Sequence, residues 1–145
     1  MGSIQSHLER IREHLDEIKD AIDEGIEKKP ITIGFHSSAC ASELLELYLH
    51  QINKIPIGKV IKHSWFKRPT PDQKIDALAD RKIGAVFPDK DKIYGLFYTI
   101  EENRDNLIYG KPTDKQIEEV LDSFEKLKRT LTEQIVKGGV KIEEI

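Results

Sequence analysis

Residues 4–26 read IQSHLERIREHLDEIKDAIDEGI, and their spacing predicts a helix. The large apolar residues recur in alternating steps of four and three, with charged residues between them, as on one stripe of an amphipathic helix. The stripe consists of Ile4, Leu8, Ile11, Leu15, Ile18, Ile22 and Ile26. We expect this helix to end at Lys28-Lys29-Pro30, because proline cannot continue the hydrogen-bond ladder. His7 and His14 lie seven residues apart on its flank, where we expect them to be solvated.

Three further segments have helical periodicity, and each is bounded by proline or glycine. We predict helices from Pro30 to Ile55, from Phe87-Pro88-Asp89 to a left-handed cap at Gly110, and from Lys111-Pro112-Thr113 to Gly138-Gly139. Thr113 and Gln116 have the spacing of a capping box. Residues 37–42 are small, so neighbouring helices can approach closely, and we expect the helix that contains them to be the central one.

Two short helices are predicted between the second and third long ones. Ile61, Trp65 and Phe66 form an apolar group that we assign to a short helix covering one end of the bundle. Thr70-Pro71-Asp72-Gln73 has the form of a capping box and predicts another short helix, which carries Ile75, Leu78 and Ala79. The chain is therefore predicted to be one all-α domain over residues 1–145, an up-down-up-down four-helix bundle with a short tail over residues 138–145.

The composition of the chain indicates the cellular compartment in which we expect the protein. The chain has 145 residues, enough for one ordinary core, and no apolar run long enough to span a membrane. The N-terminus lacks the apolar centre of a secretion signal and Cys40 is the single cysteine, so we expect a cytoplasmic protein. The abundance of Lys, Glu and Ile is typical of heat-adapted proteins. Cys40 lies among small residues and is interpreted as a packing group.

The net charge of −3 gives no general attraction to nucleic acid. Residues 54–82 are locally basic, however, and form either an ordinary solvated connection or a phosphate-binding patch. The five histidines show no HExxH or Glu-x-x-His spacing, and there is no CxxC or phosphate-binding glycine loop. We therefore predict no metal site and no cofactor.

The segment with most functional information is 101–110, EENRDNLIYG, near the end of the third long helix. Six polar residues in succession, 101–106, interrupt its apolar stripe. Arg104 and Tyr109 can converge on one groove near the helix end, particularly if a partner subunit closes that groove. The alternative is that Arg104 pairs with a carboxylate of Glu101 or of another helix while Tyr109 packs against the cap.

Three segments in this order resemble the HEPN domain family, helical domains found with minimal nucleotidyltransferases in prokaryotes. They are GFHSSACASELLELYL, GKVIKHSWF and FPDKDKIYGLFYTIEENRDNLIYG, and the similarity covers roughly Ile31 to Ile135. The resemblance implies a helical bundle that forms homodimers. Active members are metal-independent RNases with a signature of arginine, a polar residue, three others and histidine.

The resemblance assigns the catalytic positions of that signature to Arg104, Asp105 and Tyr109, with tyrosine in place of histidine. A phenol with a pKa of about 10 transfers protons poorly near neutral pH, whereas a guanidinium still binds phosphate through its planar fork. We therefore predict a protein that binds nucleotide or RNA with little or no catalysis. The resemblance also implies a small nucleotidyltransferase as its partner, as in toxin–antitoxin pairs. The predicted ligand-binding residues are Arg104, Asn106, His63, Lys62 and His36.

Two other functions stay open. The chain is an RNase if His36 or His63 replaces the missing imidazole, and the basic neighbourhood of His63 favours RNA. Alternatively, it is an interaction module without a ligand, which offers the near-heptad stripe of the first helix to a partner.

Overall fold

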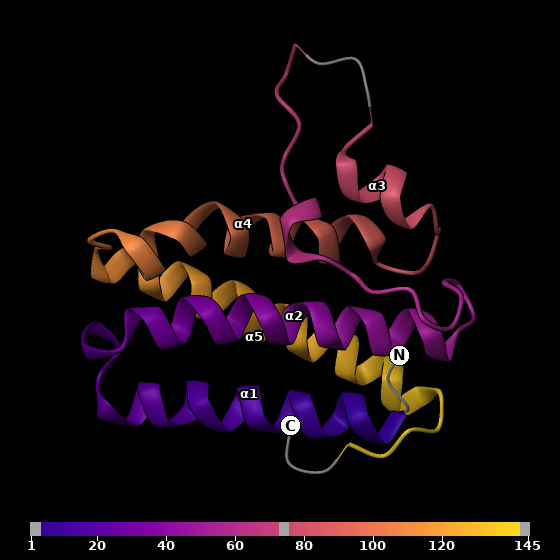
Figure 1. Cartoon of the computed structure of the whole chain (residues 1–145), viewed down its shortest axis with the longest axis horizontal. Coiled ribbons are helices and arrows are strands. Elements are labelled where there is room, and N and C mark those ends of the chain that lie inside the picture. The colour runs from indigo at the N-terminus through magenta and orange to yellow at the C-terminus, as the bar shows by residue number, and fades with distance from the viewer. Residues whose placement is uncertain (1–3, 73–75, 143–145) are drawn as a thin grey trace.

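The computed structural model describes residues 4–72 and 76–142. Four long helices form an up-down-up-down bundle, as predicted (Figure 1). They are α1 (Ile4–Glu24), α2 (Pro30–Gln51), α4 (Lys90–Tyr109) and α5 (Asp114–Lys137). The shorter elements are the 3₁₀ helices η1 (Ile26–Lys28) and η2 (His63–Trp65) and the helix α3 (Leu78–Ile83). The described residues contain no strand, and none of their helices is both long and apolar enough to cross a lipid bilayer.

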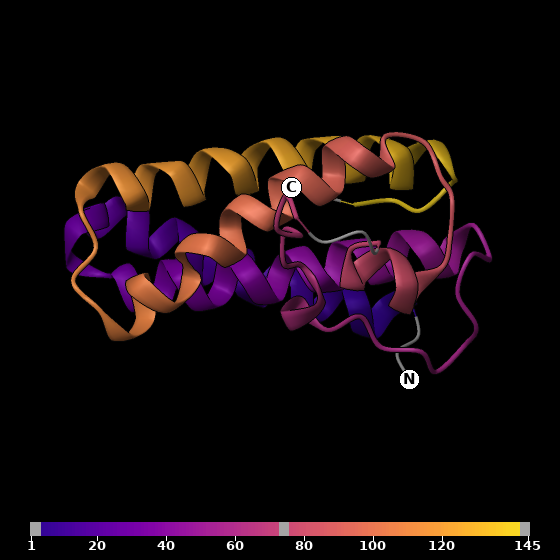
Figure 2. The same ribbon diagram turned by 90° about the horizontal axis from the view of Figure 1, so that it is seen from above.

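Helix α2 is the central helix and packs against α1, α4 and α5, as its small residues predicted. Helix α4 crosses obliquely over the groove between α2 and α5 (Figure 2). Ser37, Ser38, Cys40 and Ala41 are all buried in this arrangement. A Cβ atom at Gly34 would lie only 2.9 Å from the Cβ of Leu107, so α2 and α4 meet here at a distance that suits only glycine.

The ends of several elements differ from the sequence expectation. Helix α2 ends at Gln51 rather than Ile55, because the chain turns at Asn53, which has a φ of 57°. The predicted short helix around Ile61 and Trp65 is a single 3₁₀ turn. No helix begins at Thr70-Pro71; α3 starts only at Leu78, and the predicted positions Gln73 and Ile75 lie outside the described residues.

The turn between α4 and α5 confirms one cap and corrects another. Thr113 Oγ1 accepts the backbone N–H of Gln116 at 3.2 Å, and the Gln116 side chain accepts the N–H of Thr113 at 2.9 Å, which is the predicted capping box. Gly110 is not left-handed, since its φ is −109°. A side chain there would collide with that of Asn106, so the close approach explains the glycine.

Helix α1 buries only part of its predicted stripe. Ile11 and Ile18 are buried, whereas Ile4 and Ile22 are exposed, because α1 packs chiefly on α2. The buried face also includes His7, whose exposed fraction is 1%. The prediction of a solvated His7 was therefore wrong: in this register the residue points at α2.

Candidate functional site

A cleft forms where the segment after α2 returns along α4. Phe66 is fully buried in that segment and stacks on Phe97 of α4, with ring centroids 3.8 Å apart. The edge of Tyr94 meets the same ring at 5.3 Å. This aromatic contact fixes the residues on either side of Phe66, including His63 and Arg68, against the polar half of α4.

His63 is oriented by a carboxylate of α4. Its Nδ1 lies 2.7 Å from Oε1 of Glu101, and the other oxygen of Glu101 accepts the hydroxyl of Ser38 on α2 at 2.5 Å. The Glu101 side chain is 10% exposed and that of His63 is 40% exposed. A carboxylate on Nδ1 fixes the ring and leaves Nε2 for a ligand or a proton.

We call the space beside this pair the Arg104 cleft, and its volume is about 390 Å³. Three cations and three carboxylates line it together with His63, Ser64 and Phe66. The charged residues are Lys67, Arg68, Arg104, Glu101, Glu102 and Asp105. Arg68 donates two hydrogen bonds to Glu102, at 3.0 and 3.2 Å, and its guanidinium lies over the ring of Tyr98.

Of the two arginines in the cleft, Arg104 has the weaker contact with a carboxylate. Its side chain is 16% exposed, and the one hydrogen bond it makes among the described residues goes from Nη1 to Asp105 at 3.3 Å. The Asp105 side chain is 84% exposed, so this ion pair is weak. The Nε of Arg104 is buried, and no group in the part of the chain that the structure describes hydrogen-bonds to it. Because a guanidinium has five N–H donors, most of its capacity stays available to an anion.

The structure gathers only some of the predicted site residues. Arg104, Asp105 and His63 line one cleft. Tyr109 does not line it and is 79% exposed at the end of α4. Within the described chain, then, the guanidinium and the phenol of the resembled signature do not share a cleft.

The other predicted ligand-binding residues lie elsewhere. Asn106 donates from Nδ2 to the Gln116 side chain at 2.8 Å and so supports the start of α5. His36 faces α1, where its Nδ1 lies 2.8 Å from that of His14. Lys62 is exposed directly before η2 and is not part of the cleft lining.

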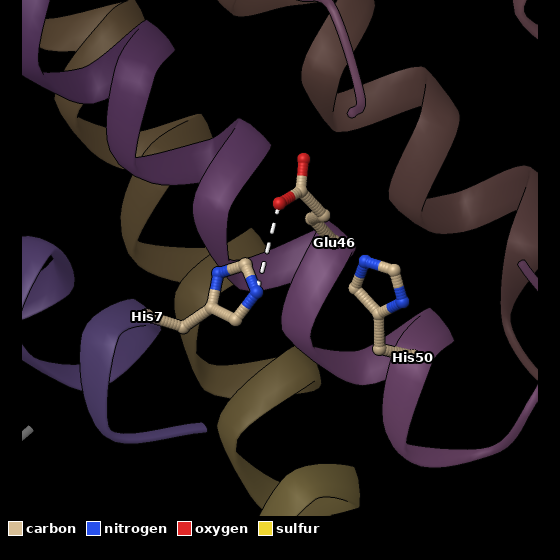
Figure 3. A group of neighbouring side chains, drawn as sticks. All are labelled: His7, Glu46 and His50. Atoms are coloured by element: carbon tan, nitrogen blue, oxygen red, sulfur yellow. Dashed lines mark ion pairs between the residues drawn. The ribbon is translucent and has the colours of Figure 1, made fainter. Parts of the chain in front are cut away.

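A second group of polar side chains lies between α1 and α2. His7, Glu46 and His50 place one ligand atom each within 4.8 Å of one another (Figure 3). We call these three residues the histidine cluster. Glu43 lies beside it and accepts hydrogen bonds at 2.8 Å from His7 and from Arg10. Burial acts to raise the pKa of Glu43, but these hydrogen bonds outweigh it and hold the pKa below its usual value.

Cys40 is not a candidate nucleophile. It is fully buried, and burial raises the pKa of its thiol far above the usual range, so the thiolate is not formed near neutral pH. The prediction of a packing role is confirmed.

Residues of both groups were not among the individually predicted site residues. Lys67 and Arg68 stand in the basic stretch next to His63, and this proximity was the readable signal. Glu46 and His50 are four residues apart, which places them on one face of α2. By contrast, no local pattern brings Glu101 to His63 or His7 to Glu46, because 38 and 39 residues separate them: those contacts depend on the bundle packing.

No protein-family model, no curated protein and no solved structure matches this chain.

Proposed function

We propose that this chain is a HEPN-like bundle that binds the phosphates of RNA or of a nucleotide in the Arg104 cleft. The observation that carries the proposal is the guanidinium of Arg104, which lines the cleft with an unpartnered Nε and one weak ion pair. A planar fork of donors matches a phosphate, and Lys67 and Arg68 line the same cleft. The resemblance of residues 101–110 to the family signature supports the same residue.

Binding of a fluorescent single-stranded oligoribonucleotide tests this function by anisotropy. Arg104→Ala is expected to weaken binding by at least about tenfold, the usual loss for a hydrogen bond to a charged group. Arg129→Ala is the matched control, because Arg129 is exposed on α5 and lies outside the cleft lining. The proposal is wrong if Arg104→Ala binds RNA and nucleotides as tightly as the parent chain.

Metal-independent RNA cleavage is a second candidate, favoured by the 2.7 Å contact between His63 and Glu101. In such a reaction Nε2 of His63 takes the proton of a 2′-hydroxyl, and O2′ attacks phosphorus. The 5′-oxygen leaves and is protonated, which gives a 2′,3′-cyclic phosphate and a 5′-hydroxyl. Glu101 stabilises the imidazolium that forms, and Arg104 stabilises the charge on the phosphate.

Two variants separate cleavage from binding. His63→Ala removes the base, and Glu101→Gln removes the carboxylate that orients it; each is expected to slow cleavage by about 10²-fold or more. RNA affinity should stay within about threefold, because neither change removes a cation. Tyr109→Phe should leave the rate unchanged. If the purified parent chain cleaves no RNA at high protein concentration, this second candidate is excluded.

We also propose that the chain forms a homodimer, as the resemblance implies. Gly34 of α2 packs against Leu107 of α4, and the apolar residues Ile31 and Phe35 close to Gly34 are 59% and 46% exposed. A second copy that covers this end of the bundle would remove that surface from water. Ile31→Asp is expected to shift the mass in sedimentation from dimer to single chain, and an unchanged mass would contradict the assignment.

The resemblance further predicts a small nucleotidyltransferase as a partner. A nucleotidyltransferase encoded by the neighbouring reading frame should co-purify with the untagged chain. If such a neighbour is present but stays separate on gel filtration, the paired system is ruled out.

A further inference from the structure

The histidine cluster joins two helices through three potential ligands. His7 comes from α1, and Glu46 and His50 come from successive turns of α2 (Figure 3). Two imidazoles and one carboxylate form a set of nitrogen and oxygen donors that suits zinc and other first-row divalent cations.

His7 has the orientation of a metal ligand. Its Nδ1 is held by Oε1 of Glu43 at 2.8 Å, and Arg10 holds the other oxygen of that carboxylate at 2.8 Å. When Nδ1 donates its hydrogen to Glu43, the lone pair of the ring lies on Nε2. Metal-binding histidines are commonly oriented by a carboxylate in this way.

The Nε2 atom of His7 is buried and has no hydrogen-bond partner among residues 4–72 and 76–142. Oε2 of Glu46 lies 3.6 Å from it, which is too far for a normal hydrogen bond. An imidazole lone pair and a carboxylate oxygen at this separation repel each other unless a proton or a metal cation lies between them. An unsatisfied polar atom with an exposed fraction of 1% for its residue is costly, so the position calls for such a cation.

Glu46 and His50 complete the set. The backbone N–H of Ile61 binds Oε1 of Glu46 at 2.8 Å, which fixes the carboxylate and leaves Oε2 facing His7. The ring of His50 lies 5.8 Å from that of His7, centroid to centroid. Both Glu46 and His50 also line a groove of about 230 Å³, so water or a small anion can reach the metal position.

We propose that His7 Nε2, Glu46 Oε2 and one nitrogen of His50 bind a single Zn²⁺ ion that fastens α1 to α2. Tetrahedral zinc has ligand bonds of about 2.0–2.2 Å, which puts neighbouring ligand atoms about 3.4 Å apart. The three atoms already lie within 4.8 Å, so small side-chain rotations close the site. A fourth position stays open toward the groove, as in zinc sites with three protein ligands.

Titration of the untagged, chelator-treated full chain tests the site. Zn²⁺ alone is added in competition with a chromophoric chelator, and Co²⁺ is added separately, because its visible absorption reports the coordination number. We expect one equivalent to bind and a tetrahedral Co²⁺ spectrum. At a Zn²⁺ concentration about one hundred times Kd, the melting temperature should rise by roughly 5–10 °C.

Substitutions identify the ligands. His50→Ala and Glu46→Gln should each weaken zinc binding by at least about tenfold, and Glu43→Gln should weaken it through the orientation of His7. His50 is only half-buried, so His50→Ala is expected to fold, and circular dichroism checks this. His14→Ala is the matched control and should bind zinc like the parent, although the His14–His36 pair also lies between α1 and α2.

The proposal is overturned if the parent chain shows no saturable binding, or if His50→Ala folds and binds zinc like the parent. Loss of zinc in His14→Ala but not in His50→Ala would also overturn it, by assigning the ion to the other histidine pair. Arg104→Ala should bind zinc like the parent chain, so the zinc site and the proposed phosphate site are tested independently of each other.

Discussion

The Arg104 cleft and the histidine cluster each contain a histidine held by a glutamate, yet their surroundings differ. His7 Nδ1 lies 2.8 Å from Glu43, and His63 Nδ1 lies 2.7 Å from Glu101. The first ring is sealed between helices, whereas the second is 40% exposed beside a row of cations. In both places the glutamate therefore sets only the orientation of the ring. The groups around the second nitrogen decide whether the site suits a metal or an anion.

The two regions lie at different seams of the bundle but share one segment. The histidine cluster joins α1 to α2, and the Arg104 cleft lies where η2 meets α4. Residues 61–66 contact both, because the N–H of Ile61 holds Glu46 and the ring of His63 contacts Glu101. Outside this shared segment the two sites have different neighbours, so substitutions that leave residues 61–66 in place should act mainly on the site at their own seam.

The largest effect is expected from Phe66→Ala, which removes the anchor of the cleft segment. The ring is fully buried and stacks on Phe97, so its loss should lower the free energy of unfolding by about 3–5 kcal/mol. Urea denaturation measures this. Phe35→Ala is the matched control: Phe35 is 46% exposed, and the expected loss is about 1 kcal/mol or less. Equal losses would contradict the role of Phe66 as an anchor.

Gly34→Ala should damage the cleft and spare the histidine cluster. The added Cβ lies 2.9 Å from Leu107 Cβ and 3.5 Å from the carbonyl oxygen of Arg104, so α4 must move. We expect a loss of about 1–3 kcal/mol in the free energy of unfolding and weaker RNA binding, with zinc affinity unchanged.

Gly95→Ala provides the control for Gly34→Ala, since nothing lies within 4 Å of a Cβ at Gly95 in α4. There the substitution should stabilise the chain by about 0.4–1 kcal/mol, because alanine loses less backbone entropy than glycine in a helix. A Gly34→Ala chain as stable as the parent would show that the contact between α2 and α4 tolerates added volume. A destabilised Gly95→Ala chain would show that the control position is not open.

A smaller effect is expected from salt concentration, which should weaken RNA binding more than zinc binding. If Lys67, Arg68 and Arg104 contact phosphates of a single strand, the affinity for RNA should fall about 20-fold between about 50 and about 200 mM salt. Zinc affinity should change far less, because its ligands bind the ion directly inside the bundle. In a plot of the logarithm of the RNA-binding constant against the logarithm of the salt concentration, Lys67→Gln should reduce the slope by about 0.7. An unchanged slope would remove Lys67 from the phosphate contacts.

The bundle was predictable because its information is local. The helical periodicity, the start of α2 at Pro30 and the capping box at Thr113 each depend on residues within a few positions of one another, and the structure confirms all three. The predicted end of the first helix at Lys28-Lys29-Pro30 was wrong: α1 ends at Glu24, because Gly25 has a φ of 115° and breaks the helix there. Boundaries failed where tertiary packing overrode the pattern. Ile55 continues the apolar run of α2 and is buried, but it is buried in a turn rather than in the helix.

The candidate sites were only half predictable for the same reason. Arg104, Asp105 and His63 could be singled out from the family resemblance and from local charge, and they do meet in one cleft. The helical position of Tyr109, five residues after Arg104, left its direction open; Tyr109 is exposed and is not among the residues that line the cleft. The burial of His7 depends on which face of α1 meets α2, and two adjoining faces of that helix carry apolar residues.

His14 and His36 form a further histidine contact, in which no glutamate of the described residues holds either ring by a hydrogen bond. Nδ1 of His14 faces Nδ1 of His36 at 2.8 Å, so one ring must donate and the other must accept. Burial, the facing His36 and the charge of Arg10 lower the pKa of His14, against the opposing charges of Glu43 and Glu13. The folded chain therefore favours neutral His14 more than the unfolded chain does.

The smallest effect we predict follows from that shift. Since the pKa of His14 is lower in the folded state, its contribution to stability is fully present above the unfolded pKa of about 6.5 and is lost as the pH falls through the folded value. Urea midpoints between pH 7.5 and pH 5 should fall more steeply for the parent chain than for His14→Gln. All other ionisable groups are the same in both chains, so their contributions cancel in the difference. Parallel slopes would contradict the prediction, because they would show that protonation of His14 does not destabilise the folded chain.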